Sequence, residues 1–148
     1  MDMITSFRGE HAFLSNFFPC AINLDGLTYS SGEAAFQAQK CTTIEDKARY
    51  TRVSPSEAKY MGKRERIDVA AWNARSYDMM LAVVRTKFAN PALAQKLLNT
   101  GDAIIIEGNT WHDNIWGRCT CPKCASKTSR NQLGMILMTV REELKLSR

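Results

Sequence analysis

The sequence contains no apolar run long enough to cross a membrane. A bilayer-spanning helix needs about 20 consecutive apolar residues, and no segment of the 148-residue chain approaches that length. The first residues, Met1–Thr5, form neither the basic nor the apolar segment of a secretory signal peptide. The sequence therefore predicts a cytoplasmic protein with no membrane partner.

Cysteines are present in an odd number, which excludes a framework in which every cysteine pairs within the chain. The five cysteines are Cys20, Cys41, Cys119, Cys121 and Cys124. Because the sequence also shows no export signal, we expect reduced thiols rather than disulfides.

Internal repeats, low-complexity stretches and linkers are also lacking, so we expect a single domain over residues 1–148. A chain of about 150 residues buries roughly 70% of its unfolded surface, and a hydrophobic content of 45% is typical of a globular core. The net charge of +5 fits an anionic ligand such as a phosphate, fits nucleic acid, and equally fits no specific partner.

Turn signals predict short strands near the N-terminus. We expect a strand at Ile4–Phe7, whereas His11–Cys20 is too irregular for a helix or a strand. Asp25-Gly26 between two short alternating runs predicts a two-residue hairpin.

Helices are expected to dominate the rest of the chain. Ser30 and Glu33 have the spacing of a capping box, which predicts a helix from Ser30 to about Cys41. We expect a strand at Ala103–Glu107 and a polar loop at Asn109–Arg130. Further helices are expected to start at Thr42, Ser54, Asp68, Asn90 and Asn131. The predicted fold is α+β: a single, mainly helical domain with a small β-sheet or hairpin.

The first expected helix carries three polar side chains that suit sugar chemistry. Glu33, Gln37 and Lys40 are spaced i, i+4 and i+7, so on one helix they share a face. A carboxylate stabilises the cation-like transition state that forms when a sugar–nitrogen bond breaks. A lysine can attack the anomeric carbon and form a Schiff base. The alternative is a solvated helix face on which Glu33 only caps the helix.

The expected polar loop contains the run Trp111–Gly117, which includes two tryptophans. Such a loop can stack on a flat base while Asp113 or Asn114 bonds ribose hydroxyls. The alternative is a structural loop whose tryptophans fill the core.

The last expected helix starts with Asn131–Gly134, where free N–H groups and the helix dipole can bind an anion. Gly134 would let a phosphate or a neighbouring backbone approach closely. The alternative, close packing of this helix at Gly134, remains open.

Three cysteines form a CxCxxC motif within the loop: Cys119, Cys121 and Cys124. Three thiolates this close can bind zinc, with His112 or a distant cysteine as the fourth ligand. The motif lacks the two separated CxxC pairs typical of zinc sites, so no metal is assigned from the sequence. Nothing in the sequence indicates an activated thiolate for a Cys–His nucleophilic pair.

Taken in order, these segments resemble the NADAR (YbiA-like) family over nearly the whole chain, from about Phe7 to Leu144. The resemblance rests on the following motifs: Phe13–Pro19, Ser31–Lys40, Gly62-Lys63, Arg66–Asp68, Trp72, Arg75, Val84–Phe88, Asn90-Pro91, Trp116-Gly117, Asn131–Gly134 and Ile136–Arg141. Two departures affect the expected choice of substrate. The family often has Glu-His where this chain has Glu33-Ala34, and Gly-Arg where it has Gly62-Lys63.

The resemblance implies a hydrolase that acts on N-glycosyl bonds without a cofactor. One substrate it implies is a phosphoribosylamino-pyrimidine intermediate of riboflavin synthesis, from which ribose 5-phosphate is released. The other is ADP-ribosylated guanine in nucleic acid. By resemblance, Glu33 and Lys40 are catalytic, and the following residues bind substrate: Asn16, Gln37, Lys63, Arg66, Trp72, Arg75, Asp113, Trp116, Asn131 and Gly134.

Two alternatives belong to other functional classes. One is a non-catalytic module that binds ADP-ribose, a nucleotide or nucleic acid. The other is a small interaction protein stabilised by zinc.

Overall fold

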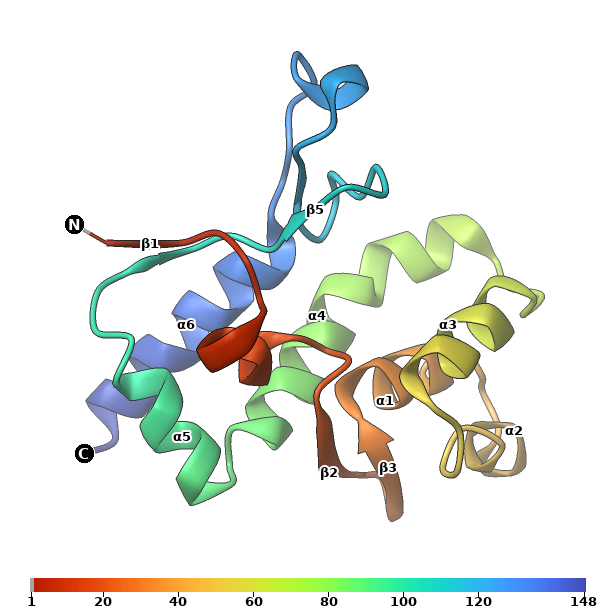
Figure 1. The fold of residues 1–148 in the computed structure, drawn as a ribbon. Helices are drawn as coiled ribbons and strands as arrows, with labels where there is room; N and C mark the ends of the chain where they lie inside the picture. Colours follow the sequence, from red (N-terminus) through yellow and green to blue (C-terminus); the bar gives the residue numbers. More distant parts are fainter. Residues whose placement is uncertain (1) are drawn as a thin grey trace. The chain divides into compact units, whose positions relative to one another are not determined.

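A computed structural model describes residues 2–148 of the chain (Figure 1). These residues form two compact units, one from Asn16–Ala89 and one from the residues up to Ser15 together with Asn90–Arg148. α-Helices dominate, with three two-stranded sheets, so the predicted α+β class is confirmed. Within the described part of the chain, no helix combines the length and apolarity that crossing a bilayer requires. The single domain over residues 1–148 stays a prediction.

The unit Asn16–Ala89 begins with an antiparallel hairpin of β2 (Pro19–Leu24) and β3 (Leu27–Ser31). Its two turn residues, Asp25 and Gly26, have φ values of 53° and 82°. Two consecutive positive φ values are the property of the type I′ turn that matches the twist of paired strands. The predicted Asp-Gly hairpin is therefore confirmed.

Helix α1 (Gly32–Ala38) is the core helix of this unit. It packs against the β2–β3 hairpin and against α3 (Pro55–Lys63) and α4 (Val69–Lys87), as Figure 1 shows. Every one of its residues is buried. A polar side chain on α1 is consequently held in a low-dielectric environment, which makes its partners important.

The predicted limits of this helix are wrong at both ends. Its N-cap is Ser31, whose hydroxyl accepts from the N–H of Ala34 at 3.1 Å, whereas the hydroxyl of Ser30 donates to Val53 O. Glu33 therefore lies in the first turn and not at the third position of a capping box. The helix ends at Ala38, because the chain then tightens into three-residue turns, one of which joins Lys40 N–H to Gln37 O at 3.1 Å.

The other predicted helix starts of this unit agree closely with the structure. The short helix α2 (Ile44–Ala48) is capped by Thr43 rather than Thr42. Ser54 caps α3, with Pro55 at its first position, and Asp68 caps α4. These caps are local hydrogen bonds between a side chain and a nearby N–H, which is why the sequence pattern predicts them.

The second unit contains a parallel pairing of β1 (Met3–Ile4) with β4 (Ile104–Ile105). Both strands are shorter than the predicted Ile4–Phe7 and Ala103–Glu107. The segment expected to be irregular includes most of a 3₁₀ helix, η1 (Gly9–Leu14), before β2 begins at Pro19.

Two helices pack together in this unit, α5 (Pro91–Leu98) and α6 (Gln132–Leu146), and α6 also packs on β4 (Figure 1). Asn90 caps α5 as predicted. The expected loop between β4 and α6 contains further structure. A parallel pair joins β5 (Gly108–Asn109) to β6 (Arg118–Cys119), and a 3₁₀ turn, η2 (Pro122–Cys124), follows.

Candidate functional site

The structure distributes the predicted site residues over both units. The unit Asn16–Ala89 holds eight of them: Asn16, Glu33, Gln37, Lys40, Lys63, Arg66, Trp72 and Arg75. The other unit holds Asp113, Trp116, Asn131 and Gly134.

Glu33 and Gln37 form a buried pair on α1. Nε2 of Gln37 donates to Oε1 of Glu33 at 2.9 Å, and the two residues are 8% and 7% exposed. Burial of a carboxylate requires hydrogen bonds to it, and the amide one turn along supplies one. The alternative of a solvated face with a merely capping Glu33 is therefore wrong.

Lys40 lies just beyond the end of α1 and is half-buried. Its Nζ donates to Gly62 O at 3.1 Å and lies 5.9 Å from the centre of the Trp72 ring. Burial lowers the pKa of Lys40, while the negative charges of Glu33 and Glu65 act in the opposite direction. The charges of the predicted acid and amine thus interact, although Lys40 lies in a turn beyond the helix.

Trp72 is the aromatic centre of this group of residues. Its ring lies 5.2 Å from that of Phe36, and the guanidinium of Arg75 lies 5.1 Å from the ring centre. Arg75 also donates to Gln39 O at 2.8 Å. One indole therefore contacts the cations of both Lys40 and Arg75, and cation–π attraction orients them.

Asn16 closes the first turn of α1. Its carbonyl oxygen accepts from the N–H of Glu33 at 2.9 Å, and its side-chain amide donates to Sδ of Met80 at 3.3 Å. Asn16 is 9% exposed. It holds the backbone that carries Glu33, which is a positioning contribution that the sequence pattern did not specify.

Gly62 is required where α3 meets the Gln37 side chain. A Cβ atom at position 62 would lie 1.9 Å from Oε1 of Gln37. That oxygen is buried and has no hydrogen-bond partner among the described residues. Lys63 and Arg66, the predicted phosphate contacts that follow, are both exposed.

Glu65 is a residue near Lys40 that the sequence analysis missed. Its carboxylate accepts from Arg49 at 2.6 Å and from the Tyr50 hydroxyl at 3.0 Å. The Sγ of Cys41 lies 3.5 Å from its other oxygen. No local pattern links position 65 to Arg49 and Tyr50, because their contact arises from packing between separate segments.

In the second unit, Asp113 has an internal partner for its carboxylate. Its Oδ1 accepts from the N–H groups of Ile115 and Trp116 at 3.1 and 2.9 Å. Trp111 is 53% exposed and Trp116 is intermediate, so the alternative in which both tryptophans fill the core is wrong. Asp113 shapes the loop that carries Trp116.

The first two N–H groups of α6 are not free for the anion that the sequence suggested. The N–H groups of Gln132 and Leu133 donate to Ile115 O and Trp116 O, each at 3.0 Å. The prediction is wrong for these two groups because loop carbonyls, and not a phosphate, satisfy them.

Asn131 and Gly134 join this helix to β4 and the residues after it. The Asn131 amide donates to Ile105 O at 2.9 Å and accepts from the N–H of Glu107 at 3.0 Å. A Cβ atom at Gly134 would lie 2.2 Å from Ile105 O. The alternative of close packing therefore describes Gly134, and substrate binding by either residue stays a prediction.

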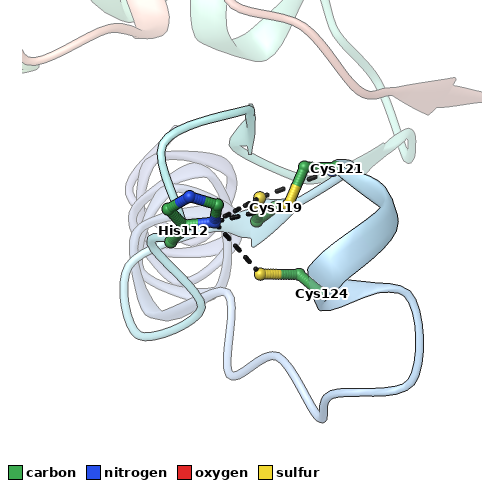
Figure 2. A group of neighbouring side chains, drawn as sticks. All are labelled: His112, Cys119, Cys121 and Cys124. Atoms are coloured by element: carbon green, nitrogen blue, oxygen red, sulfur yellow. Dashed lines mark hydrogen bonds between the residues drawn. The ribbon is translucent and has the colours of Figure 1, made fainter.

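The three cysteines of the CxCxxC motif lie around His112 (Figure 2). The possible ligand atoms of these four residues all lie within 4.8 Å of one another. Of the two fourth ligands that the sequence left open, the structure places the histidine in the cluster.

One surface hollow, of about 380 Å³, lies over the β2–β3 hairpin, with Cys20, Tyr29 and Thr51 among its lining residues. It contains none of the predicted site residues, so it carries no functional argument.

Residues 5–145 match the model of the NADAR domain, which spans both units. A riboflavin biosynthesis protein of Vibrio vulnificus is 36% identical over 141 residues, covering 91% of this chain. The chain spans only 36% of the length of that relative.

Two relatives of similar size carry the name N-glycosidase. N-glycosidase YbiA of Escherichia coli is 32% identical over 142 residues, which cover 94% of this chain and 85% of that protein. An N-glycosidase of Nostoc punctiforme is 32% identical over 137 residues, which cover 88% and 84%.

The fold is similar to the solution NMR structure of E. coli YbiA. The TM-score is 0.81 at 30% identity, and the match covers 99% of this chain and 87% of YbiA. With its ordered motifs, its fold and one family model matching nearly its whole length, this chain belongs to the NADAR family.

Proposed function

We propose that this chain is an N-glycosidase that hydrolyses the ribosyl C–N bond of a phosphorylated N-riboside. The observation that carries the proposal is the buried Glu33 carboxylate, oriented by Gln37, with the desolvated amine of Lys40 within its electrostatic range. The names of the E. coli and Nostoc relatives support the reaction class.

Glu33 is the group that stabilises the transition state. Cleavage of an N-glycosidic bond builds positive charge on the anomeric carbon and ring oxygen. A carboxylate that is already oriented and shielded from water stabilises that charge without reorganisation. The Gln37 amide holds Oε1 in place at 2.9 Å.

Lys40 is the group proposed to form a covalent intermediate. Burial lowers its pKa, which increases the fraction of neutral amine that can attack C1. The amine forms a bond to C1 as the bond to the base nitrogen breaks, and that nitrogen leaves with a proton. The product of this step is a glycosylamine. The ribose ring then opens at the bond between C1 and the ring oxygen, which takes up the remaining amine proton, and the nitrogen lone pair forms the imine. Water adds to C1 of the imine, restoring the free amine and releasing the sugar phosphate.

Positive side chains near the pair suit a phosphorylated sugar. Lys63 and Arg66 are exposed at and after the end of α3, and Arg75 is exposed on α4 beside Trp72. The charge of Lys63 acts on Lys40, lowering its pKa, so the two amines lie within electrostatic range. We assign the phosphate to these three cations.

The substrate class that we favour is the phosphoribosylamino-pyrimidines of riboflavin biosynthesis. The support is the match to the Vibrio protein, whose name places it in riboflavin biosynthesis. Cleavage of such a substrate releases ribose 5-phosphate and an aminopyrimidine.

The test is to incubate the protein with a phosphoribosylamino-pyrimidine and to identify the released sugar by mass spectrometry. Ribose 5-phosphate is expected. ADP-ribosylated guanine is assayed in parallel. If sugar is released only from this compound, as ADP-ribose, the N-glycosidase reaction stands and the substrate class changes to ADP-ribosylated guanine. Tight binding of both compounds without turnover would make the chain a binding module and overturn the proposal.

Matched variants assign the two groups. Glu33→Gln and Lys40→Ala are each expected to lower kcat by at least about 100-fold, the usual effect of removing an electrostatic or nucleophilic group. Glu45→Gln and Lys47→Ala on α2, none of whose residues is buried, make the same chemical changes outside the predicted site and are expected to keep the wild-type rate. Full activity in both site variants would show that the site has been placed wrongly.

Borohydride separates the covalent route from simple charge stabilisation. With substrate present, reduction is expected to attach the sugar phosphate to Lys40, detectable by peptide mass spectrometry. Absence of the adduct in a turning-over enzyme would leave Glu33 as the only catalytic group of the pair.

A further inference from the structure

Four side chains between β5 and the end of η2 point toward a common centre (Figure 2). His112 lies between β5 and β6, Cys119 lies in β6, and Cys124 ends η2. Cys121 immediately precedes η2. We call this set, His112, Cys119, Cys121 and Cys124, the Cys₃His cluster.

The sulfur–nitrogen distances within the cluster are close to those around a tetrahedral zinc ion. The sulfur atoms of Cys119, Cys121 and Cys124 lie 3.9, 3.3 and 3.5 Å from Nδ1 of His112. A zinc ion with Zn–S bonds of about 2.3 Å and a Zn–N bond of about 2.05 Å separates sulfur from nitrogen by about 3.6 Å at tetrahedral angles. The three sulfur–nitrogen distances lie close to this value, and all four ligand atoms lie within 4.8 Å of one another.

Hydrogen bonding by itself does not account for this arrangement. Nδ1 of an imidazole either donates one proton or offers one lone pair, so it satisfies one thiol and not three. Figure 2 shows the three contacts converging on this single nitrogen. A cation at the centre satisfies all four ligand atoms at once.

The backbone around the cluster is held in position by its own hydrogen bonds. The parallel pairing of Asn109 with Cys119 fixes the separation between β5, which precedes His112, and β6, which carries the first cysteine of the cluster. The Asn109 side chain bonds both backbone groups of Asp113, at 2.8 and 3.1 Å, which closes the turn that carries His112. The N–H of Cys121 donates to Sγ of Cys119 at 3.4 Å, the kind of second contact that orients a metal ligand.

We propose that the Cys₃His cluster is a structural zinc site with four protein ligands: Nδ1 of His112 and Sγ of Cys119, Cys121 and Cys124. Three soft thiolates and one imidazole suit zinc, whereas magnesium and calcium take oxygen ligands. Because all four coordination positions are filled by the protein, none remains for water or substrate, so the ion stabilises the fold and takes no part in catalysis.

The ion cross-links a segment that has little regular secondary structure of its own. Between β4 and α6 the chain has only the short β5 and β6 strands and one 3₁₀ turn. The carbonyl groups of Ile115 and Trp116 in this segment accept hydrogen bonds from the first N–H groups of α6. Zinc binding therefore fixes both the loop and the start of the last helix.

The first experiment measures metal content in the full chain, purified without chelator under reducing conditions. Elemental analysis by inductively coupled plasma mass spectrometry is expected to find about one zinc per chain. Removal of the ion with a strong chelator is expected to lower the melting temperature by several degrees, and added zinc restores it. Cobalt substituted for zinc is expected to show the visible bands of tetrahedral coordination and thiolate charge transfer in the near ultraviolet.

Variants locate the ion. Cys124→Ser and His112→Ala are expected to lower zinc retention at least tenfold, whereas Cys20→Ser, which changes a cysteine of β2, keeps one zinc per chain. If either cluster variant fails to fold, cobalt spectra of the wild-type protein still report the ligand set. The proposal is overturned if the purified wild-type protein contains no zinc, its melting temperature does not rise with added zinc, and added cobalt gives no absorption bands. A disulfide within the motif, a bound iron–sulfur cluster, or zinc that persists in both variants also overturns it.

Discussion

On α1, Nε2 of Gln37 donates to Oε1 of Glu33 across one helical turn, at 2.9 Å, with both side chains buried. This bond fixes the orientation of the carboxylate before any substrate arrives. Replacement of Gln37 by leucine is expected to lower kcat more than it changes KM, because the carboxylate loses its orienting partner. The unfolding free energy should fall by about 1–3 kcal/mol, since a buried carboxylate loses a hydrogen bond.

Gln95→Leu is the matched control for Gln37→Leu. Gln95 donates to Oδ1 of Asn99 at 2.8 Å with the same i, i+4 spacing, but the pair is exposed. Urea denaturation and steady-state kinetics on both variants separate burial from hydrogen bonding as such. Equal losses in the two variants would contradict the importance of the buried pair.

Gly62→Ala is expected to displace the Gln37 amide from Glu33. The new Cβ would lie 1.9 Å from Oε1 and 2.6 Å from Cδ of Gln37, so the side chain must move. We expect a loss of about 1–3 kcal/mol of unfolding free energy, despite the greater helix propensity of alanine. The double variant Gly62→Ala with Gln37→Ala should be less destabilised than the sum of the two single variants, because the clash is absent.

Gly32→Ala provides the comparison for Gly62→Ala on the same helix bundle. A Cβ at Gly32 would lie 3.2 Å from Oδ1 of Asn16, a contact that a small shift relieves. Urea denaturation should therefore show a smaller loss than at position 62. An equal or larger loss at Gly32 would contradict the packing described for Gly62.

Titration of Lys40 should respond to the charge of Glu33. Burial lowers the Lys40 pKa below its ordinary value of 10.5, and Glu33 partly opposes that effect. Glu33→Gln removes the negative charge, so the pKa of Lys40 is expected to fall further. NMR of ¹³C-dimethylated lysines measures this pKa directly, with Lys47 as the internal control. An unchanged or higher pKa of Lys40 in the variant would show that the two groups do not interact.

Lys87 should make the stability of the protein rise with pH. Burial lowers its pKa to about 8, with Nζ 5.6 Å and 5.3 Å from the centres of the Phe18 and Phe88 rings. Between pH 8 and the ordinary lysine pKa, the unfolded chain therefore binds more protons than the folded one. The unfolding free energy gained from this group rises with pH, by about 1–2 kcal/mol between pH 8 and 9.5.

The contribution of Lys87 is measured as a difference between wild type and Lys87→Met. Burial raises the pKa of Cys20, which lowers stability as pH rises, and the charge of Lys87 opposes that shift. The variant loses this opposing charge, so both effects make the wild-type curve rise more steeply than that of the variant. Urea denaturation at pH 7.5, 8.5 and 9.5 should show a steeper rise for wild type. If the unfolding free energies of the two proteins changed with pH in parallel, Lys87 would not titrate between pH 7.5 and 9.5, and the prediction would be wrong.

The sequence by itself determined several of the local elements and the family. Ser54, Asp68 and Asn90 cap their helices as predicted, and Asp25-Gly26 forms the predicted hairpin turn. These features depend on hydrogen bonds and backbone preferences within a few residues. The mainly helical α+β class follows from the same local patterns.

The tertiary structure decided the contacts that give those residues their chemistry. Packing buries Glu33 beside Gln37, brings Lys40 over Trp72, and adds Glu65, which no local spacing indicated. It also assigns the N–H groups at the start of α6 to loop carbonyls, and it places His112 against three cysteines. Burial, charge interaction and ligand geometry depend on segments far apart in the chain, and their separation is set only when the core packs.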